Sequence, residues 1–369
     1  MRVLFDNLGF DVVPYGGVSR YLAELIVALR RLKLATTITP FFFTENRHLK
    51  DRQFKTIVPL PHSLPWRYKR YYKKINSVTT RVALRAKLGE ILHMTYYDLS
   101  LLEVASCPTI ATVHDMIPEL FPTHFPDPAA VHPNKRELSQ AASAVICVSH
   151  TTKTDLIRLL GIDPAKIFVT YLGIDAKWAA ACRPRKGLPE RFIMFVGNRA
   201  GYKNFVQLSS SMSRLARRYC DLHLLCVGGG GFTPEEKSSF ADASLSDRVH
   251  QFNATDGELA YCYAKSVAFV FPSLYEGFGI PVLESFVCGC PAILSNRGSL
   301  PEVAADAAAY FDPDDVESLD HAIDRVLGDP QLRATMVSRG RLRAADFTSE
   351  KTALETAVVY RNVLERRRR

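Results

Sequence analysis

Several patterns that mark other protein classes are missing from these 369 residues. No apolar run approaches the roughly 20 residues of a transmembrane helix, since the longest, such as residues 267–271, have the length of a strand. The N-terminus meets an acid at Asp6, so we expect no secretory signal. The GxxxxGK[ST], HExxH and GxSxG motifs are also absent, which argues against P-loop, zinc-protease and serine-hydrolase chemistry.

Cysteine pairs in the CxxC pattern are missing too. The eight cysteines stand singly, apart from Cys288 and Cys290, and most have apolar neighbours. Such cysteines are usually small buried side chains, so we expect a reducing, cytoplasmic compartment. Apolar residues make up 47% and charged residues 23% of the chain. This ordinary globular mix excludes a disordered chain and a small disulfide scaffold.

Short apolar runs alternate with helical periodicity in two series along the chain. The first series comprises residues 3–6, 36–43, 91–96, 110–113 and 145–148, and the second 192–197, 222–227, 249–252, 267–271 and 292–295. The alternation predicts an α/β fold with two parallel sheets, each covered on both faces. A polar stretch with Pro and Arg at 176–190 separates the series. We therefore expect one domain over 1–180, a second over 181–348 and a final helix over 349–369.

One strand of the second series leads into the segment with the richest chemistry. Gly277 and Gly279 follow Glu276 there, and a helix then begins with Pro281 near its first position, where proline is favoured. The glycines let the backbone approach a ligand, and the N–H groups at the helix start attract an anion such as pyrophosphate. Glu284, in the first turn, could accept two hydrogen bonds from a ribose diol. The alternative is an acidic first turn that merely suits the helix dipole.

Three other loops after strands carry candidate residues. Arg199 and Lys203 follow the first strand of the second series, although a basic pair in a loop is often only solvated. Gly16 and Gly17 open the first long helix, where any tight turn also favours glycine. His114 ends a strand of the first series, and a lone histidine there is more often structural than catalytic.

Taken together and in this order, these segments resemble the retaining glycosyltransferases of the GT-B fold, above all glycosyltransferase family 4 (glycosyl transferases group 1). The spacing of Glu276 and Glu284 resembles the Glu-x7-Glu signature of that family, in which the first glutamate faces the donor sugar and the second binds the ribose. The resemblance implies two Rossmann-like domains facing a cleft. The N-terminal domain would bind the acceptor and the C-terminal domain the nucleotide sugar, with the last helix returning to the N-terminal domain.

The resemblance also implies a role for each candidate residue. The expected catalytic residues are Glu276, Lys203, Arg199 and His114, of which the basic pair neutralises the donor diphosphate. The expected donor-binding residues are Gly16, Gly17, Phe252, Asn253, Gly277, Phe278, Gly279, Leu283 and Glu284. We expect no cofactor and no essential metal, because the basic pair and the helix N-terminus supply positive charge, although Asp312-Pro313-Asp314 is similar to a metal-binding DxD.

The positive charge of the chain is concentrated in one stretch, residues 52–88, which contains no acid. Its basic residues are Arg52, Lys55, Arg67, Lys69, Arg70, Lys73, Lys74, Arg81, Arg85 and Lys87, interleaved with Trp66, Tyr68, Tyr71 and Tyr72. Basic and aromatic residues together suit an anionic membrane surface. They would also suit single-stranded nucleic acid or a solvated face with acceptor-binding loops. We favour a protein at the inner face of the plasma membrane and expect no nucleic acid.

The sequence therefore predicts a retaining hexosyltransferase that takes a sugar from a GDP- or UDP-sugar. By family frequency the donor is GDP-mannose, and the acceptor is a saccharide or a lipid-linked saccharide in bacterial exopolysaccharide or lipopolysaccharide biosynthesis. Two alternatives stay open. One is a GT-B hydrolase or epimerase of nucleotide sugars, and the other is a non-catalytic basic module that binds membranes or nucleic acid.

Overall fold

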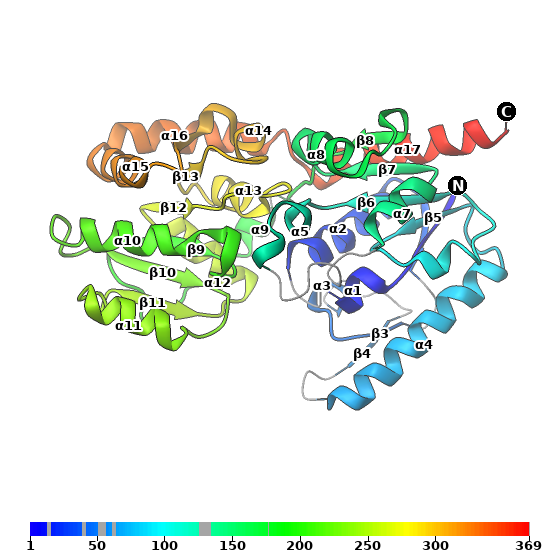
Figure 1. Cartoon of the computed structure of the whole chain (residues 1–369), viewed down its shortest axis with the longest axis horizontal. Coiled ribbons are helices and arrows are strands. Elements are labelled where there is room, and N and C mark those ends of the chain that lie inside the picture. The colour runs from blue at the N-terminus through cyan, green and yellow to red at the C-terminus, as the bar shows by residue number, and fades with distance from the viewer. Residues whose placement is uncertain are drawn as a thin grey trace. The chain divides into compact units, whose positions relative to one another are not determined.

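The computed structural model describes residues 1–12, 16–38, 42–50, 57–60, 64–124, 134–175 and 177–368 (Figure 1). The chain divides into two compact units. The first comprises Met1–Gly173 together with Ser349–Arg369, and the second comprises Ile174–Thr348. The domain boundaries expected from the sequence lie between residues 180 and 181 and between residues 348 and 349.

The first unit is built on a six-stranded parallel sheet in the order β2-β1-β5-β6-β7-β8. The strands are β1 (Arg2–Phe5), β2 (Ala35–Ile38), β5 (Ile91–Met94), β6 (Thr109–Val113), β7 (Ala144–Cys147) and β8 (Ile167–Val169). Every residue of β5, β6 and β7 is buried, as in a strand covered on both faces. The helices are α1 (Leu8–Val12), α2 (Gly17–Arg31), α3 (Arg47–Lys50), α4 (Trp66–Arg85), α5 (Ile117–Leu120), α7 (Lys135–Ala141), α8 (His150–Leu160) and α17 (Ser349–Arg368).

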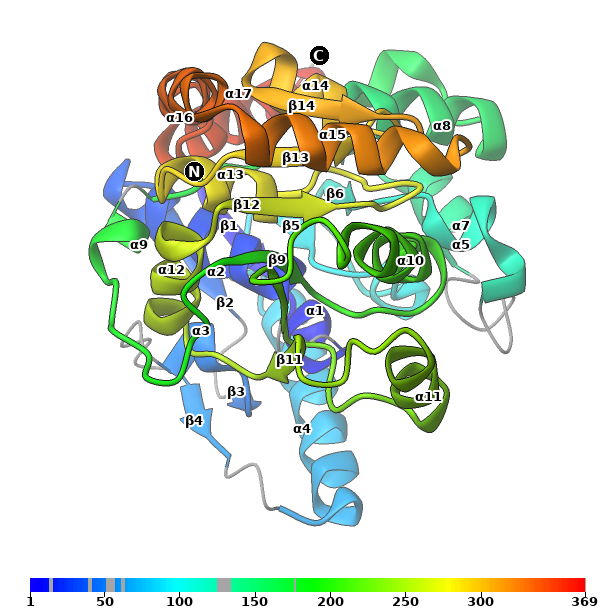
Figure 2. The ribbon, with the colours of Figure 1, turned by 90° about the vertical axis from the view of Figure 1, so that its left-hand side faces the viewer.

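The second unit repeats this design with the strand order β11-β10-β9-β12-β13-β14. Its strands are β9 (Phe192–Val196), β10 (His223–Val227), β11 (Val249–Phe252), β12 (Ala268–Phe271), β13 (Ala292–Ser295) and β14 (Ala308–Phe311). Its helices are α9 (Lys177–Ala180), α10 (Phe205–Leu215), α11 (Pro234–Asp242), α12 (Asp256–Lys265), α13 (Ile280–Val287), α14 (Leu300–Ala304), α15 (Val316–Gly328) and α16 (Pro330–Ala344). Figure 2 shows α10 on one side of this sheet and α12 on the other. The predicted α/β class with two Rossmann-like parallel sheets is confirmed.

One predicted strand is wrong. The apolar run at 36–43 does not form a single element, because β2 ends at Ile38 and β3 (Phe42–Thr44) pairs instead with β4 (Ile57–Pro59) in a separate two-stranded sheet. Residues 39–41 lie outside the described part. Pro40 stands between the two strands in the sequence, and a proline cannot donate a hydrogen bond to a strand ladder.

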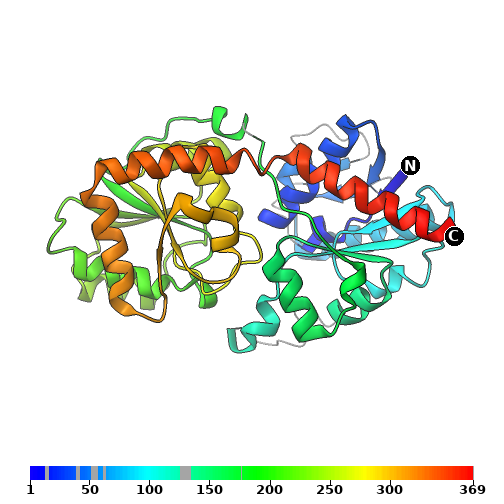
Figure 3. The ribbon, with the colours of Figure 1, turned by 90° about the horizontal axis from the view of Figure 1, so that it is seen from above.

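The last helix is part of the core of the first unit. Helix α17 packs against α2 and lies along this unit in Figure 3. The Tyr360 hydroxyl lies 2.6 Å from His93 Nδ1, and His93 Nε2 lies 2.8 Å from Thr112 Oγ1. Burial lowers the pKa of His93 to about 3, so the ring is neutral at neutral pH. The fully buried ring thus joins α17 to the middle of the sheet.

This contact predicts a loss of stability in Tyr360→Phe. The substitution removes a hydroxyl and leaves a buried ring nitrogen of His93 without its partner. We expect the free energy of unfolding to fall by about 1–3 kcal/mol, measured by urea denaturation. Tyr71→Phe is the matched control, because the Tyr71 side chain is 62% exposed. Equal stability of the two variants would contradict this role for the hydroxyl.

Candidate active site

The predicted site residues lie in both units, and each unit is described by itself. Gly16, Gly17 and His114 belong to the first unit, and all the others belong to the second. In the second unit, β9 and β12 are neighbouring parallel strands. The loops that follow them therefore leave the same edge of the sheet, where ligands bind in open α/β folds.

An ion pair joins these two loops. Lys203 Nζ, after β9, lies 2.6 Å from Glu276 Oε1, after β12, and both side chains are largely buried. The ammonium group also lies 4.9 Å from the centre of the Phe271 ring. Next to it, the Leu274 N–H donates to the Tyr202 carbonyl at 2.8 Å. The structure thus brings together two residues that are 73 positions apart in the sequence.

A third loop, after β13, holds the backbone of Glu276. The Ser299 hydroxyl donates to the Glu276 carbonyl at 2.9 Å. Gly298 has a φ of +60°, and a Cβ there would lie 2.9 Å from the Glu276 nitrogen. Only glycine fits so close an approach in this conformation. Neither residue is predicted from the sequence, and the Gly-Ser pair after a strand is the only signal that could have pointed to them.

Helix α13 begins at the same edge and carries the second glutamate. Glu284 is its fifth residue, so the expected place in the first turn is wrong, because the helix begins at Ile280. Gly279 precedes it with a φ of +93°, a conformation that suits glycine. Glu284 is buried, and its Oε2 accepts a hydrogen bond from the Tyr263 hydroxyl at 3.2 Å. Burial, with the nearby Glu284 carboxyl, raises the pKa of Tyr263 well above its usual value. Tyr263 therefore stays a hydrogen-bond donor and holds this carboxyl in place.

Two other predicted donor-binding residues of this segment have buried side chains. Phe278 packs edge-to-face on Phe347, with 5.7 Å between the ring centres. Leu283 is fully buried within the unit. Any contact that these residues make with a ligand therefore falls to their backbone groups.

The Arg199 side chain forms hydrogen bonds with other groups of the same unit. Its Nε donates to Glu236 at 2.8 Å, and its two terminal nitrogens donate to the carbonyls of Gly228, Gly230 and Gly231 at 2.9–3.2 Å. The guanidinium group therefore holds the glycine-rich turn between β10 and α11. A contact of Arg199 with a diphosphate stays a prediction, and the structure adds this positioning role.

The end of β11 carries the remaining predicted pair. The Phe252 ring lies 3.6 Å below the guanidinium carbon of Arg185, which also forms an ion pair with Glu258 at 3.0 Å. Asn253 is exposed. The sequence singled out neither Arg185 nor the stacking, because Arg185 lies in the polar stretch expected to be a linker.

In the first unit, the loop after β6 is held by a buried lysine. Lys135 Nζ donates to the Asp115 carbonyl at 3.0 Å and pairs with Glu119 at 2.8 Å. His114 is half-buried, with its ring 5.7 Å from that of Tyr21 in an edge-to-face arrangement. Gly16 has a φ of +127° and precedes α2, so this turn also suits glycine.

The two aspartates of the DxD-like segment form ion pairs with an arginine. Arg297 Nη2 lies 2.8 Å from Asp312 and also pairs with Asp314. In the described part of the chain, no group of three or more His, Cys, Asp or Glu side chains is arranged to hold a metal ion.

The conformation of the glycine-rich turn predicts that two alanine variants in it differ in stability. Gly229 has a φ of +74°, and a Cβ there would lie 2.6 Å from the Gly197 carbonyl oxygen. We expect Gly229→Ala to lower the free energy of unfolding by about 1–3 kcal/mol, measured by urea denaturation. Gly231→Ala is the control, because its Cβ meets nothing within 4 Å. Wild-type stability of both variants would show that the turn tolerates a side chain.

Comparison with known proteins places these features in a family. A family model described as Glycosyltransferase Family 4 matches residues 15–178, and one described as Glycosyl transferases group 1 matches residues 181–343. The alpha-maltose-1-phosphate synthase of Mycobacterium tuberculosis is 30% identical over 408 aligned positions, which cover 98% of this chain and 100% of that protein. The O-antigen chain mannosyltransferase B of Escherichia coli is 27% identical over 266 positions, 68% of this chain and 70% of its own.

Solved structures show the same fold at lower identity. A sucrose-phosphate synthase from Thermosynechococcus elongatus superposes with a TM-score of 0.76 at 22% identity, covering 99% of each chain. HepE of Anabaena, solved with UDP-glucose, has a TM-score of 0.74 at 16% identity and covers 98% of this chain and 100% of its own. The family models, the relative at 30% identity and the shared fold agree. The chain belongs to glycosyltransferase family 4, the glycosyl transferases group 1, and has the GT-B fold.

Proposed function

We propose that this glycosyltransferase moves a hexose from a nucleoside diphosphate sugar to a saccharide or lipid-linked acceptor, with retention at the anomeric carbon. The observation that carries the proposal is the Lys203–Glu276 pair at the sheet edge, with Glu284 buried in the helix that follows. In the proposed complex the donor diphosphate takes the place of Glu276 as the partner of Lys203. The Glu276 carboxylate then accepts hydrogen bonds from the donor sugar, and Glu284 accepts them from the ribose.

The reaction breaks the bond between the anomeric carbon and the diphosphate oxygen and forms a bond to the acceptor oxygen on the same face. The proton of the acceptor hydroxyl passes to the departing diphosphate. Negative charge grows on that diphosphate, where Lys203 and the N–H groups at the start of α13 stabilise it. These groups supply the required positive charge, so we propose a reaction that runs in the presence of EDTA.

The relatives guide the choice of donor and pathway. The O-antigen chain mannosyltransferase B of Escherichia coli supports mannose as the sugar, and HepE supports a UDP-sugar as the alternative. We propose GDP-mannose as the donor and bacterial polysaccharide or lipopolysaccharide biosynthesis as the process. Turnover of the donor without an acceptor would instead identify a hydrolase or epimerase.

Donor binding and turnover can be separated by two substitutions. Glu284→Gln keeps an acceptor for the Tyr263 hydroxyl but removes the charge, so we expect about tenfold weaker binding of the nucleoside diphosphate, or about 1.4 kcal/mol. Lys203→Ala removes charge that acts on the leaving group, so we expect turnover to fall by about 100-fold or more. Calorimetry with GDP and UDP, and initial rates with EDTA present, measure the two effects.

The matched controls for these variants are Glu235→Gln and Lys237→Ala. Both residues are exposed in the first turns of α11, in the same unit. Wild-type affinity in Glu284→Gln together with wild-type turnover in Lys203→Ala would overturn the site assignment.

A membrane surface is the proposed location of the enzyme, on the cytoplasmic side. Within the described ranges, no helix is long and apolar enough to cross a membrane. One face of α4 nevertheless exposes apolar side chains, of which Tyr71 is 62%, Val78 58% and Val82 56% exposed. Lys74 and Arg85 are exposed on the same helix. An apolar stripe beside basic residues suits an anionic lipid surface. The basic residues Arg52 and Lys55 lie outside the described residues.

The exposed face of α4 predicts binding to anionic vesicles that depends on its apolar and its basic side chains. We expect Tyr71→Asp/Val78→Asp to weaken binding to phosphatidylglycerol vesicles by about tenfold or more, because it places charge in the apolar stripe. Co-sedimentation at low and high salt measures the effect. Val206→Asp is the control, because Val206 is 75% exposed on α10 in the other unit. The membrane proposal fails if the double variant binds vesicles as the wild type does.

A further inference from the structure

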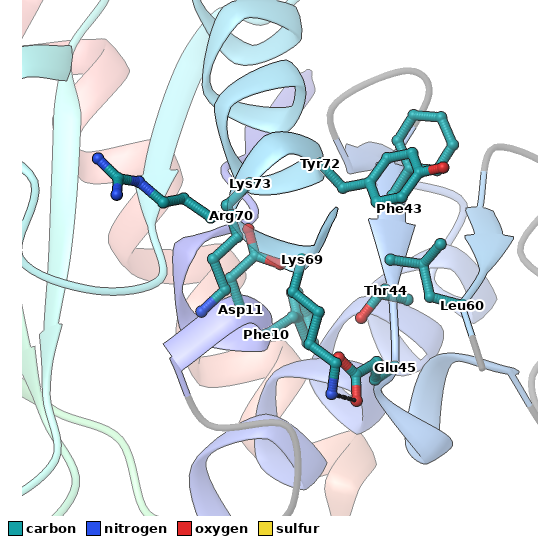
Figure 4. A pocket seen from close by; sticks show the side chains of 10 residues that line it. All are labelled: Phe10, Asp11, Phe43, Thr44, Glu45, Leu60, Lys69, Arg70, Tyr72 and Lys73. Carbon is teal, nitrogen blue, oxygen red and sulfur yellow. Dashed lines mark hydrogen bonds and ion pairs between the residues drawn. The ribbon is translucent and has the colours of Figure 1, made fainter. Parts of the chain in front are cut away.

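A pocket of about 230 Å³ lies within the first unit, and none of the residues that line it is among the expected catalytic or donor-binding residues (Figure 4). Helix α1, which follows β1, forms part of its wall, and residues at the carboxyl ends of β3 and β4 form another part. Helix α4 covers it. Ligands of open parallel sheets bind beyond the carboxyl ends of strands, so the pocket is placed where such a fold holds a ligand.

The pocket has an aromatic wall. The rings of Phe43 and Tyr72 lie 4.6 Å apart, centre to centre, at 33°. Figure 4 shows the two rings side by side at one end of the pocket. The C–H face of a sugar ring packs well on such a surface. The volume is below the roughly 300 Å³ of a pocket for a drug-sized ligand, which favours a single sugar unit.

The opposite wall is charged. Lys69 Nζ lies 2.9 Å from Glu45 Oε2, the pair joined by the dashed line in Figure 4. One turn further along α4, Lys73 lies near Asp11, whose carboxyl accepts hydrogen bonds from Asn7 at 2.7 Å and Asn76 at 3.2 Å. Within one small pocket, the carboxylates can accept hydrogen bonds from sugar hydroxyls and the ammonium groups can donate hydrogen bonds to them.

The charges do not balance within the pocket. Burial raises the pKa of Asp11 to about 7, which weakens this carboxyl as a counter-charge for Lys73. Three basic side chains, Lys69, Arg70 and Lys73, line the pocket against two acids, Asp11 and Glu45. The wall is therefore positive on average, and an anionic group on the ligand would restore the balance.

We propose that this pocket binds an acidic sugar unit of the acceptor, one that carries a phosphate or a carboxylate. The anionic group pairs with Lys69 and Lys73, the sugar ring packs on Phe43 and Tyr72, and its hydroxyls donate to Asp11 and Glu45. The proposal rests on the proposed function, because it identifies the ligand as the acceptor.

The test compares charged and neutral sugars on the whole protein. Saturation-transfer NMR titrations would use mannose 6-phosphate, glucuronate and mannose. We expect the two charged sugars to bind at least about tenfold more tightly than mannose, and Lys69→Ala/Lys73→Ala to abolish that difference. Lys74→Ala is the matched control, because Lys74 is exposed on α4 but does not line the pocket. Lys203→Ala should also keep the difference, which excludes the donor site as its source.

A second variant tests the proposal in case the double variant does not fold. Tyr72→Leu removes the aromatic wall and keeps every charge, so it should weaken all three sugars by a similar factor. Equal affinity for mannose and the charged sugars would overturn the proposal, as would loss of binding in Lys74→Ala or Lys203→Ala.

Two outcomes separate this proposal from the others. If phosphatidylglycerol vesicles bind in a manner that depends on Lys69 and Lys73 but the soluble charged sugars do not bind, these lysines belong to a lipid surface and the pocket proposal is wrong. If instead the protein binds no nucleoside diphosphate, the proposed function fails. Charged-sugar binding that depends on Lys69 and Lys73 would still establish the pocket as a site.

Discussion

The ion pair between Lys203 and Glu276 joins the loops that follow two neighbouring strands, and the other groups of the second unit are arranged around it. Two opposite charges this close in a largely buried setting stabilise each other, but each also keeps a strong capacity to bind a new partner. A bound anion would compete for the lysine and leave the carboxylate to hydroxyl donors. In the proposed donor complex, the ligand would replace this pair without leaving either charge buried alone.

Backbone conformation sets the precision of this arrangement. Gly279 and Gly298 adopt positive φ angles, and a side chain at Gly298 would collide with the Glu276 backbone. Arg199 fixes the neighbouring turn through carbonyl oxygens of three glycines. The site thus depends on glycines whose backbone is held by a few polar side chains. The positions of the charged groups follow from this backbone packing.

Much of the fold could be predicted from the sequence, because strands buried on both faces appear as uninterrupted apolar runs. Strands β6 and β7 lie within one residue of their predicted ranges. The prediction of one strand over 36–43 was wrong because apolarity does not show which partner a strand pairs with. Strands β4, β8 and β14 were missed, and the first two have only three residues each.

The candidate site was predictable only in part. Glu276 and Lys203 could be found because they follow strands, and Glu284 because its spacing from Glu276 resembles the family signature. Tyr263 and Lys135 could not be predicted. Tyr263 acts on Glu284 of α13 from α12, and Lys135 acts on the loop after β6 from α7. Neither has a local pattern that distinguishes it from an ordinary helix residue.

The path of the chain has a consequence for how the protein is made. The chain leaves the first unit after Gly173 and re-enters it at Ser349, so the second unit is an insertion within the first. The sheet of the first unit is synthesised before the second unit, but the helix that supplies Tyr360 to the buried His93 is translated after it. During translation the second unit can complete its own core before the first unit receives Ser349–Arg369, which complete its fold. A premature stop near the end would therefore damage the half of the protein that is made first.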